Sequence, residues 1–377
     1  METRIIELSS VIKDIAAGPF GSNLKVSCFV EKGFPIIDGA NLKGIKVTDN
    51  VTKFVTEEKA RSLHRSIASR GDVVVTISGN VGQIAYIPNN SQYAEYLVSQ
   101  RQFRVTFDTE QVYVPYLVYY FHTYEGQHKI LAFANQTGVP ALAQPLKNFK
   151  KITINLPTLN EQKRIASTCE VITRKIETND QINDNLQQQA QAIYTAMFIS
   201  NADPAWDQGQ LSDLITVKYG KDHKKLADGA YPVFGSGGIM RYVERPLYTG
   251  ESVLIPRKGT LNNVMYVNEP FWSVDTMFFT EMKIPNVAKF VFHFVKAKDL
   301  ESMNAGSAVP SMTTDILNAL ELAIPSAERL AEFESVVTPM YQTMQANNRE
   351  SAKLAELRDT LLPKFMSGEM NVSNIDI

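Results

Sequence analysis

The chain has 377 residues, of which 44% are hydrophobic and 10% aromatic. This is enough apolar material for more than one packed core, and it excludes an intrinsically disordered protein. The 38 basic and 40 acidic residues give a formal net charge of −2, so the chain is not a polycation that coats nucleic acid, and any such role must rest on local basic patches. No signal segment and no run of about 18 apolar residues is present, and we expect a cytoplasmic protein with no membrane contact.

Cysteine and histidine usage gives no sign of a metal centre. Cys28 and Cys169 lie far apart and fit two ordinary thiols in a reducing cytosol. The five histidines, at positions 64, 122, 128, 223 and 293, lack the spacing of metal ligands. We therefore expect neither a disulfide nor a metal site.

The first part of the chain, residues 1–158, is predicted to form a mixed α/β module in which strands dominate. Residues 71–88 predict two strands joined by a tight polar turn at Ser78-Gly79-Asn80. Residues 114–121 have the length and apolar content of one buried helix. A long helix is expected next, over residues 159–199.

The second part of the chain is expected to contain the same elements again. In chain order these are a linker (200–210), a second α/β module (211–326), a second long helix (327–366) and a polar tail (367–377). Residues 252–255 and 264–267 predict the strands of a second hairpin, with residues 256–260 at its tip. Residues 287–294 predict the second buried helix.

An internal repeat relates the two modules. Five pairs of segments match in the same order along the chain. The matched pairs are 8–12 with 211–215, 34–35 with 231–232, 71–74 with 250–253, 139–140 with 309–310, and 156–157 with 324–325. The offset falls from 203 to 168, so the first copy is longer by 35 residues, as expected for two modules with different surface loops.

The two long helices share one apolar seam. From Ile165 to Met197, apolar or Asn side chains recur at alternating spacings of four and three, and eight of the ten positions keep this character 168 residues later. Asn179 and Asn347 occupy corresponding points, where a buried amide would fix the register of a coiled coil. The alternative is an ordinary amphipathic helix packed on its own module. We also expect Pro339 to kink or interrupt the second helix. The predicted fold class is mixed α/β (α+β), with two tandem modules joined by two long helices that pair as an antiparallel coiled coil.

Three segments of the sequence resemble the specificity subunits of type I restriction-modification systems. They are Gly18-Pro19-Phe20-Gly21-Ser22-Asn23-Leu24-Lys25, the run 154–162 that ends in Glu161-Gln162, and the C-terminal run 357–369 with its Leu361-Leu362-Pro363. The resemblance extends from end to end, although at Glu328-Arg329 the second copy keeps the Glu and not the Gln.

The resemblance implies that each module is a target recognition domain that reads one half of a split, asymmetric site in double-stranded DNA. The paired helices would set the distance between the half-sites and dock DNA-adenine methyltransferase subunits. Methylation, cleavage and translocation would belong to partner chains, with S-adenosylmethionine on the methyltransferase and no cofactor or catalytic residue in this chain.

The candidate DNA contacts lie in loops of both modules. They are Ser22, Asn23 and Lys25; Ser78, Asn80 and Gln83; Lys218, Lys221, Lys224 and Lys225; and Arg257 and Lys258. Lysines suit phosphate contact, Arg257 and Lys258 can reach phosphates or guanine edges, and amides suit adenine. Solvated surface loops are the alternative. Residues 235–238, which are rich in glycine, are a candidate counterpart of residues 18–25, although the glycines of both could serve only the fold.

The sequence offers little for an enzyme. Neither a Walker phosphate-binding spacing nor a Rossmann glycine triad is present. Asp203-Pro204-Ala205-Trp206 resembles the catalytic loop of amino-methyltransferases only faintly, because it lacks the second proline. An autonomous methyltransferase would have to bind S-adenosylmethionine by itself. The main competing interpretation is a non-catalytic protein-interaction scaffold built from tandem modules on a coiled coil.

Overall fold

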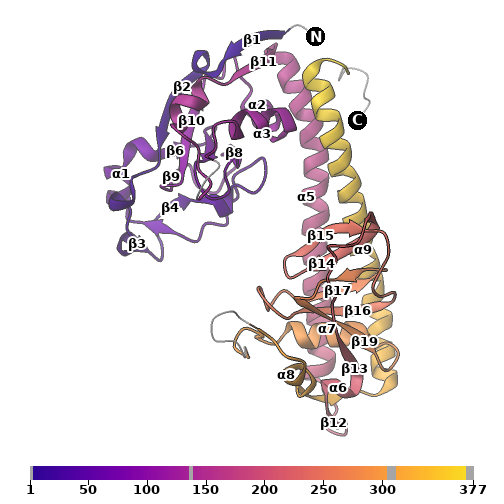
Figure 1. Cartoon of the computed structure of the whole chain (residues 1–377). Coiled ribbons are helices and arrows are strands. Elements are labelled where there is room, and N and C mark those ends of the chain that lie inside the picture. The colour runs from indigo at the N-terminus through magenta and orange to yellow at the C-terminus, as the bar shows by residue number, and fades with distance from the viewer. Residues whose placement is uncertain (1–2, 136–138, 304–310, 371–377) are drawn as a thin grey trace. The chain divides into compact units, whose positions relative to one another are not determined.

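The computed structural model describes residues 3–135, 139–303 and 311–370, and the chain divides into two compact units. Unit 1 comprises residues 1–178 and 350–377, and unit 2 comprises residues 179–349. Each unit contains one α/β module and one part of each long helix (Figure 1). In the part of the chain that is described, no helix is long and apolar enough to cross a membrane.

Three sheets form the module of unit 1. The antiparallel four-stranded sheet has the order β2 (Ile12–Ala17), β10 (Gln102–Phe107), β7 (Val73–Thr76), β8 (Ile84–Tyr86). A five-stranded sheet has the order β3 (Phe29–Val30), β5 (Phe54–Val55), β4 (Phe34–Ile37), β9 (Glu95–Val98), β6 (Ile67–Ser69). In the third sheet, β1 (Thr3–Glu7) pairs with β11 (Thr153–Pro157). The hairpin predicted from residues 71–88 is confirmed as the antiparallel pair β7–β8.

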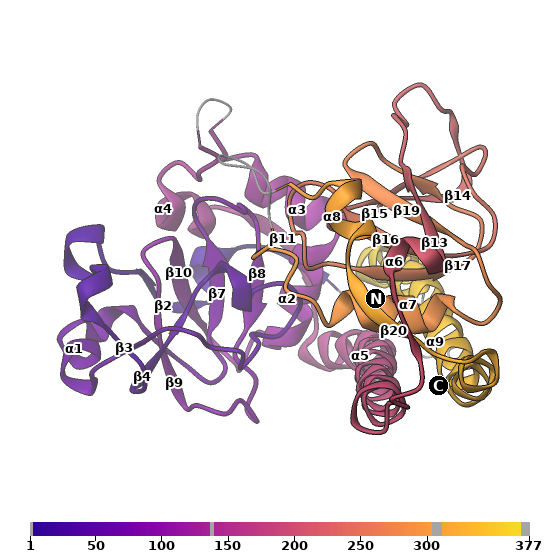
Figure 2. The same cartoon turned by 90° about the horizontal axis from the view of Figure 1, so that it is seen from below.

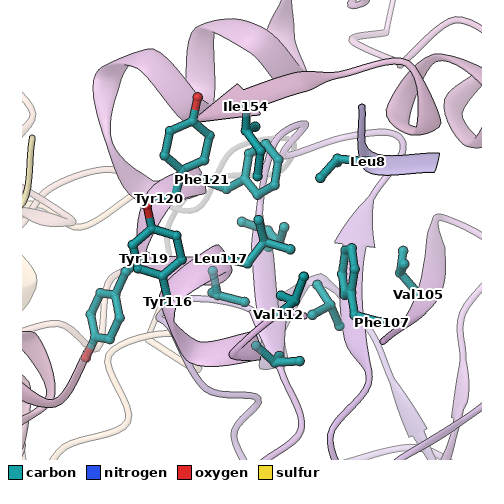
Figure 3. Packing of buried hydrophobic residues seen from close by; sticks show 14 of the residues in the cluster. Leu8, Val105, Phe107, Val112, Tyr116, Leu117, Tyr119, Tyr120, Phe121 and Ile154 are labelled. Atoms are coloured by element: carbon teal, nitrogen blue, oxygen red, sulfur yellow. The ribbon is translucent and has the colours of Figure 1, made fainter. Parts of the chain in front are cut away.

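Helix α2 (Val114–His122) is the predicted buried helix of unit 1. Pro115 occupies its first turn, where the missing N–H has no cost. Figure 3 shows Leu117 and Phe121 of α2 among the same buried residues as Phe107 and Ile154. Each such side chain contributes about 1.5–3 kcal/mol by leaving water. The shorter helices are α1 (Glu57–Ser62), α3 (Tyr124–Leu131) and α4 (Pro145–Lys150).

Unit 2 repeats this arrangement. Its four-stranded sheet has the order β13 (Ile215–Tyr219), β19 (Met277–Met282), β16 (Glu251–Pro256), β17 (Met265–Asn268). A second sheet has the order β15 (Gly238–Val243), β14 (Asp228–Gly235), β18 (Trp272–Ser273). In a third, two-stranded sheet, β12 (Asp207–Gln210) pairs with β20 (Glu321–Ile324), and β12 lies within the segment that was expected to be a linker. The helices are α6 (Leu211–Leu214), α7 (Ala288–Lys296) and α8 (Thr314–Asn318), and α7 is the predicted buried helix.

The matched segments of the sequence fall on equivalent strands, with one slip. Residues 12 and 215 open β2 and β13, and Pro35 and Pro232 lie at the same point of β4 and β14, each of which has a parallel neighbour. The match of residues 71–74 with 250–253 is wrong by one residue, because the strand pairing makes Val73 equivalent to Val253. Such a slip moves side chains to the opposite face of a strand. Residues 309–310 lie outside the described residues.

The two long helices are α5 (Leu159–Thr195), which continues as a π-helical turn over Ala196–Ser200, and α9 (Ala327–Ser367). Figures 1 and 2 show them side by side. In unit 1, Lys175 forms an ion pair with Glu350 at 3.2 Å, and Ile165 and Cys169 share a buried cluster with Leu362 and Phe365. In unit 2, Asn183 bonds to Asn347, and the rings of Tyr194 and Phe333 lie 6.2 Å apart. Residue numbers rise on one helix as they fall on the other, so the helices pair antiparallel.

A kink or an interruption was expected at Pro339; the interruption is wrong, because α9 runs through this residue, and the kink stays a prediction. A proline inside a helix removes one backbone hydrogen bond at a cost of about 3 kcal/mol. The flanking residues Val337 and Met344 are buried, and this packing offsets the cost. The carbonyl of Pro339 also accepts a hydrogen bond from the Thr343 hydroxyl at 2.9 Å.

Candidate nucleic-acid interface

The loop that follows β2 is fixed at both of its ends. The backbone N–H of Gly18 donates to the carbonyl of Gln102 at 2.8 Å, and a Cβ at Gly18 would overlap the carbonyl oxygen of Ser99. Six residues later, Leu24 is buried in the module. Between these anchors Ser22 and Asn23 are exposed, and Lys25 follows them at the surface. We call residues 18–24 the first edge loop.

The tip of the hairpin β7–β8 presents polar side chains beside a second backbone segment. Gly79 has a φ of +88°, which favours glycine, and its N–H donates to the carbonyl of Pro140 at 3.1 Å. Ser78 is half-buried and Asn80 is exposed. The Gln83 side chain is half-buried, and its Oε1 accepts a hydrogen bond from the Thr76 hydroxyl at 3.3 Å.

The turn that joins β9 to β10 brings these two segments together. Ser99 in this turn touches Gly18, while the carbonyl of Arg101 accepts a 2.7 Å hydrogen bond from the backbone of Ile77. The first edge loop and the hairpin tip therefore lie at one edge of unit 1. Arg101 and Gln100 are exposed at the same edge. Neither was predicted from the sequence, because no local pattern marks a short turn between two strands as part of a site.

The corresponding loop of unit 2 follows β13. The Gly220 N–H donates to the carbonyl of Met277 at 3.0 Å, and a Cβ at Gly220 would overlap the carbonyl oxygen of Val274. Six residues later, Leu226 is buried. Residues 220–226, the second edge loop, are thus equivalent to residues 18–24. The suggested counterpart at residues 235–238 is wrong: Gly235 and Gly238 pair across the turn between β14 and β15, and the resemblance was one of glycine content alone.

Three of the four predicted lysines lie on the second edge loop. Lys221, Lys224 and Lys225 are all exposed. The backbone of Lys221 is fixed by its N–H to Ser273 and by the indole N–H of Trp272, which donates to its carbonyl at 2.8 Å. The backbone N–H of Lys224 donates to the Asp222 carboxylate at 3.0 Å and lowers the pKa of that group.

Lys218 is not part of this loop. It lies in β13, and its Nζ is 3.5 Å from the Glu281 carboxylate. Because successive side chains of a strand point to opposite faces, Lys218 and Tyr219 lie on opposite faces of the sheet.

The second hairpin tip is built like the first. Ser78 and Lys258 occupy equivalent positions, each in an isolated bridge, and each is followed by a glycine at positive φ, +88° for Gly79 and +87° for Gly259. The Arg257 guanidinium lies 5.7 Å from the ring centroid of Tyr219, which is 52% exposed. Tyr219 thus connects the tip to the second edge loop. Tyr219 was not predicted from the sequence, since an aromatic residue at the end of a strand gives no distinctive pattern.

The histidines inside the apolar helices have structural partners. His122 Nε2 is 2.8 Å from the carbonyl of Ile84, and His293 lies between Gln191 and the Tyr341 hydroxyl. Burial lowers the pKa of His293 to about 3. Among the described residues no group of three His, Cys, Asp or Glu side chains is arranged to hold a metal ion.

Comparison with known proteins identifies the repeated module. Residues 19–188 and 205–355 both match the family model described as type I restriction modification DNA specificity domain. The chain is 21% identical to the type I restriction enzyme MjaIX specificity subunit of Methanocaldococcus jannaschii, over 97% of this chain and 93% of the relative. It is 32% identical to the EcoprrI specificity subunit of Escherichia coli over 26% of this chain and 25% of the relative.

A solved structure supports the fold. The S subunit of a type I restriction-modification system from M. genitalium aligns with a TM-score of 0.59 and 17% identity, over 97% of this chain and 96% of that one. The family model matches the chain twice, and the structure contains two copies of one module together with two paired long helices. The chain belongs to the family of type I restriction-modification specificity subunits.

Proposed function

We propose that each module reads one half of a bipartite, asymmetric site in double-stranded DNA. One observation carries this proposal: equivalent positions in the two modules hold different polar side chains. Ser22 and Asn23 of the first edge loop correspond to Lys224 and Lys225 of the second, and Ser78 corresponds to Lys258. Two copies of one scaffold with different tips are suited to two different half-sites.

The side chains at each edge suggest how bases are distinguished. The amides of Asn80 and Gln83 can pair with N6 and N7 of adenine, whereas Arg257 and Lys258 can donate to O6 and N7 of guanine. Each bidentate pair discriminates by about 1–3 kcal/mol. The lysines of the second edge loop would neutralise phosphates and fix the module on the duplex.

The helix pair would serve as the spacer and as the docking surface for partner chains. With 37 residues in α5 and 41 in α9, the helices have lengths of roughly 55 and 60 Å. We propose DNA-adenine methyltransferase subunits and an endonuclease/translocase subunit as partners. S-adenosylmethionine would bind to the methyltransferase, and this chain would be non-catalytic.

Methylation mapping tests the proposal directly. Adenine methylation would be mapped across the host genome by single-molecule sequencing, with the gene intact and with it deleted, while the methyltransferase gene stays expressed. We expect deletion to remove methylation at one split, asymmetric motif. An unchanged methylome would contradict DNA reading and favour the protein-interaction scaffold.

A matched pair of variants assigns the half-sites. Asn80→Ala is expected to alter only the half-site read by unit 1, and Lys258→Ala only the other half-site. If both variants altered the same half, the assignment of one module to each half would be wrong.

A further inference from the structure

The two edge loops share a backbone and differ in chemistry. Each spans seven residues between a glycine that permits close backbone packing and a buried leucine, Gly18 to Leu24 and Gly220 to Leu226. Aligned on these anchors, Phe20 corresponds to Asp222, and Pro19 corresponds to Lys221. The two loops can therefore be compared position by position.

The first edge loop exposes an aromatic ring and carries no charge. Phe20 is 82% exposed. A 3₁₀ turn over Gly21–Asn23 follows it, closed by a 2.8 Å hydrogen bond from the Asn23 N–H to the Phe20 carbonyl. Pro19 before it has a fixed φ. An ordered backbone thus holds the ring outside the module. The ring stays in water, so it does not contribute the free energy of burial to folding.

The second edge loop is cationic. Lys221, Lys224 and Lys225 are exposed, and the one carboxylate of the loop, Asp222, accepts a backbone hydrogen bond from Lys224. The Arg257 guanidinium beside Tyr219 adds positive charge next to the loop. Compact ammonium groups on flexible stems suit phosphate contact, and their binding is strongly salt-dependent.

We propose that the two equivalent loops hold DNA by different physical means: Phe20 makes an apolar contact with bases, whereas Lys221, Lys224 and Lys225 contact phosphates. The inference rests on the proposed function, namely that these edges face DNA. Apolar side chains contact bases in two known ways, by insertion at a base step or against the methyl group of thymine. Both replace water around the ring, and neither releases counterions.

The two modes give opposite signatures in a salt titration. Each lysine that contacts a phosphate of B-DNA contributes about 0.9 to the slope of log K against log salt concentration. Removing such a lysine lowers the slope, so the loss of affinity is largest at low salt. Removing Phe20 loses the burial of its ring, so it lowers affinity by the same factor at every salt concentration, roughly tenfold or more, and leaves the slope unchanged.

The experiment uses the full chain assembled with its methyltransferase subunits and a duplex that contains the mapped site. Fluorescence anisotropy from about 50 to 300 mM salt would compare wild type, Phe20→Ala and single alanine variants of Lys221, Lys224 and Lys225. Ile5→Ala is the control for loss of an exposed apolar side chain, since Ile5 is 76% exposed on β1. Lys218→Ala is the control for loss of a lysine, because that side chain pairs with Glu281 and points to the face of the sheet opposite to Tyr219.

We expect Phe20→Ala to weaken binding by the same factor at every salt concentration, and the lysine variants to lower the slope where Lys218→Ala does not. Repeating the Phe20→Ala comparison on duplexes with uracil in place of thymine distinguishes the two contacts. An effect that disappears identifies the thymine methyl, and an effect that persists identifies insertion between bases.

Two results would overturn the inference while leaving DNA reading intact. In the first, Phe20→Ala binds the duplex no more weakly than Ile5→Ala does. In the second, Phe20→Ala lowers the slope of log K against log salt concentration as much as a lysine variant does. A wild-type complex with neither salt-dependent nor sequence-specific binding would overturn the proposed function as well. Thermal unfolding of each variant checks that the module is still folded.

Discussion

Asn347 on α9 donates its side-chain amide to the Oδ1 of Asn183 on α5 at 2.9 Å. Asn183 in turn donates to the Oδ1 of Asn348 at 2.8 Å. Asn179, the sequence equivalent of Asn347, is fully buried four residues earlier on α5. Asn347 therefore meets Asn183, which lies about one helical turn from its sequence equivalent Asn179.

Replacing one member of the pair Asn183–Asn347 by leucine is expected to destabilise unit 2. Asn183→Leu removes this acceptor from the half-buried Asn347 amide, at a cost of about 0.5–1.5 kcal/mol in the free energy of unfolding. The double variant Asn183→Leu with Asn347→Leu is expected to recover most of this loss, since two apolar residues fill the seam. Urea unfolding of the wild type and the three variants measures the coupling. Additive losses would contradict a direct interaction.

The long helices show what the sequence can and cannot predict. The recurrence of apolar positions from Ile165 onward predicted both helices, because a repeat sustained for so many turns arises in few other structures. It could not identify which Asn faces which, since that depends on the register of the antiparallel pair. Nor could it show that burial of Val337 and Met344 keeps the helix continuous at Pro339, because local propensity contains no tertiary packing.

A buried lysine links the module of unit 2 to α9. The Lys289 side chain is 2% exposed, its Nζ lies 2.8 Å from the Glu251 carboxylate, and it also forms an ion pair with Glu334. Lys289→Met leaves two carboxylates without their counter-charge and is expected to reduce the free energy of unfolding by about 3–5 kcal/mol. Lys218→Met, which removes an exposed pair with Glu281, should cost about 0–1 kcal/mol. Equal losses in urea unfolding would contradict a central role for Lys289.

The same cluster predicts a pH dependence. Burial alone would raise the pKa of Glu251, but hydrogen bonds from Lys289 and Tyr266 outweigh it and hold the pKa below the ordinary value of 4.5. A carboxyl group with a lowered folded-state pKa stabilises the fold above its ordinary pKa and loses this contribution as the pH falls through the folded value. The stability advantage of the wild type over Glu251→Gln is therefore expected to be complete at pH 7 and to shrink below pH 4.5. Unfolding midpoints across this range measure it, and a constant difference would rule out the coupling.

Gly18 is predicted to tolerate no side chain. A Cβ there would overlap the backbone oxygen of Ser99, so Gly18→Ala must displace the first edge loop or the turn beside it. We expect a loss of about 1–3 kcal/mol in stability and weaker recognition of the half-site read by unit 1. Gly44→Ala is the control, because nothing lies within 4 Å of the position that its methyl group would take. Its unfolding midpoint should stay close to that of the wild type, and an equal loss in both variants would refute the steric argument.

The two edges also show how far a site can be predicted from sequence. The polar hairpin tips at Ser78 and Lys258 could be located, because two apolar strand-like runs separated by a glycine-containing segment indicate a hairpin turn. The partner of residues 18–25 was sought by glycine content and placed at residues 235–238, whereas position in the sheet identifies residues 220–226. Arg101 joins its site through a backbone bond with Ile77, and Tyr219 meets Arg257, and both contacts connect residues that are distant in the sequence.

The proposed spacer can be shortened without disturbing its central bond. Deleting residues 174–180 from α5 and 348–354 from α9 removes one heptad at the same level of both helices and keeps the bond between Asn183 and Asn347. Seven residues correspond to about 10 Å of helix, or about three base pairs of DNA. If the helix pair sets the spacing, the variant should methylate a motif with both half-sites unchanged and a spacer about three base pairs shorter. Methylome mapping determines the half-site sequences and the spacer length in one measurement. A variant that folds and methylates with the original spacing would refute the ruler, and deletion from α5 alone, which breaks the pairing, is the control expected to abolish methylation.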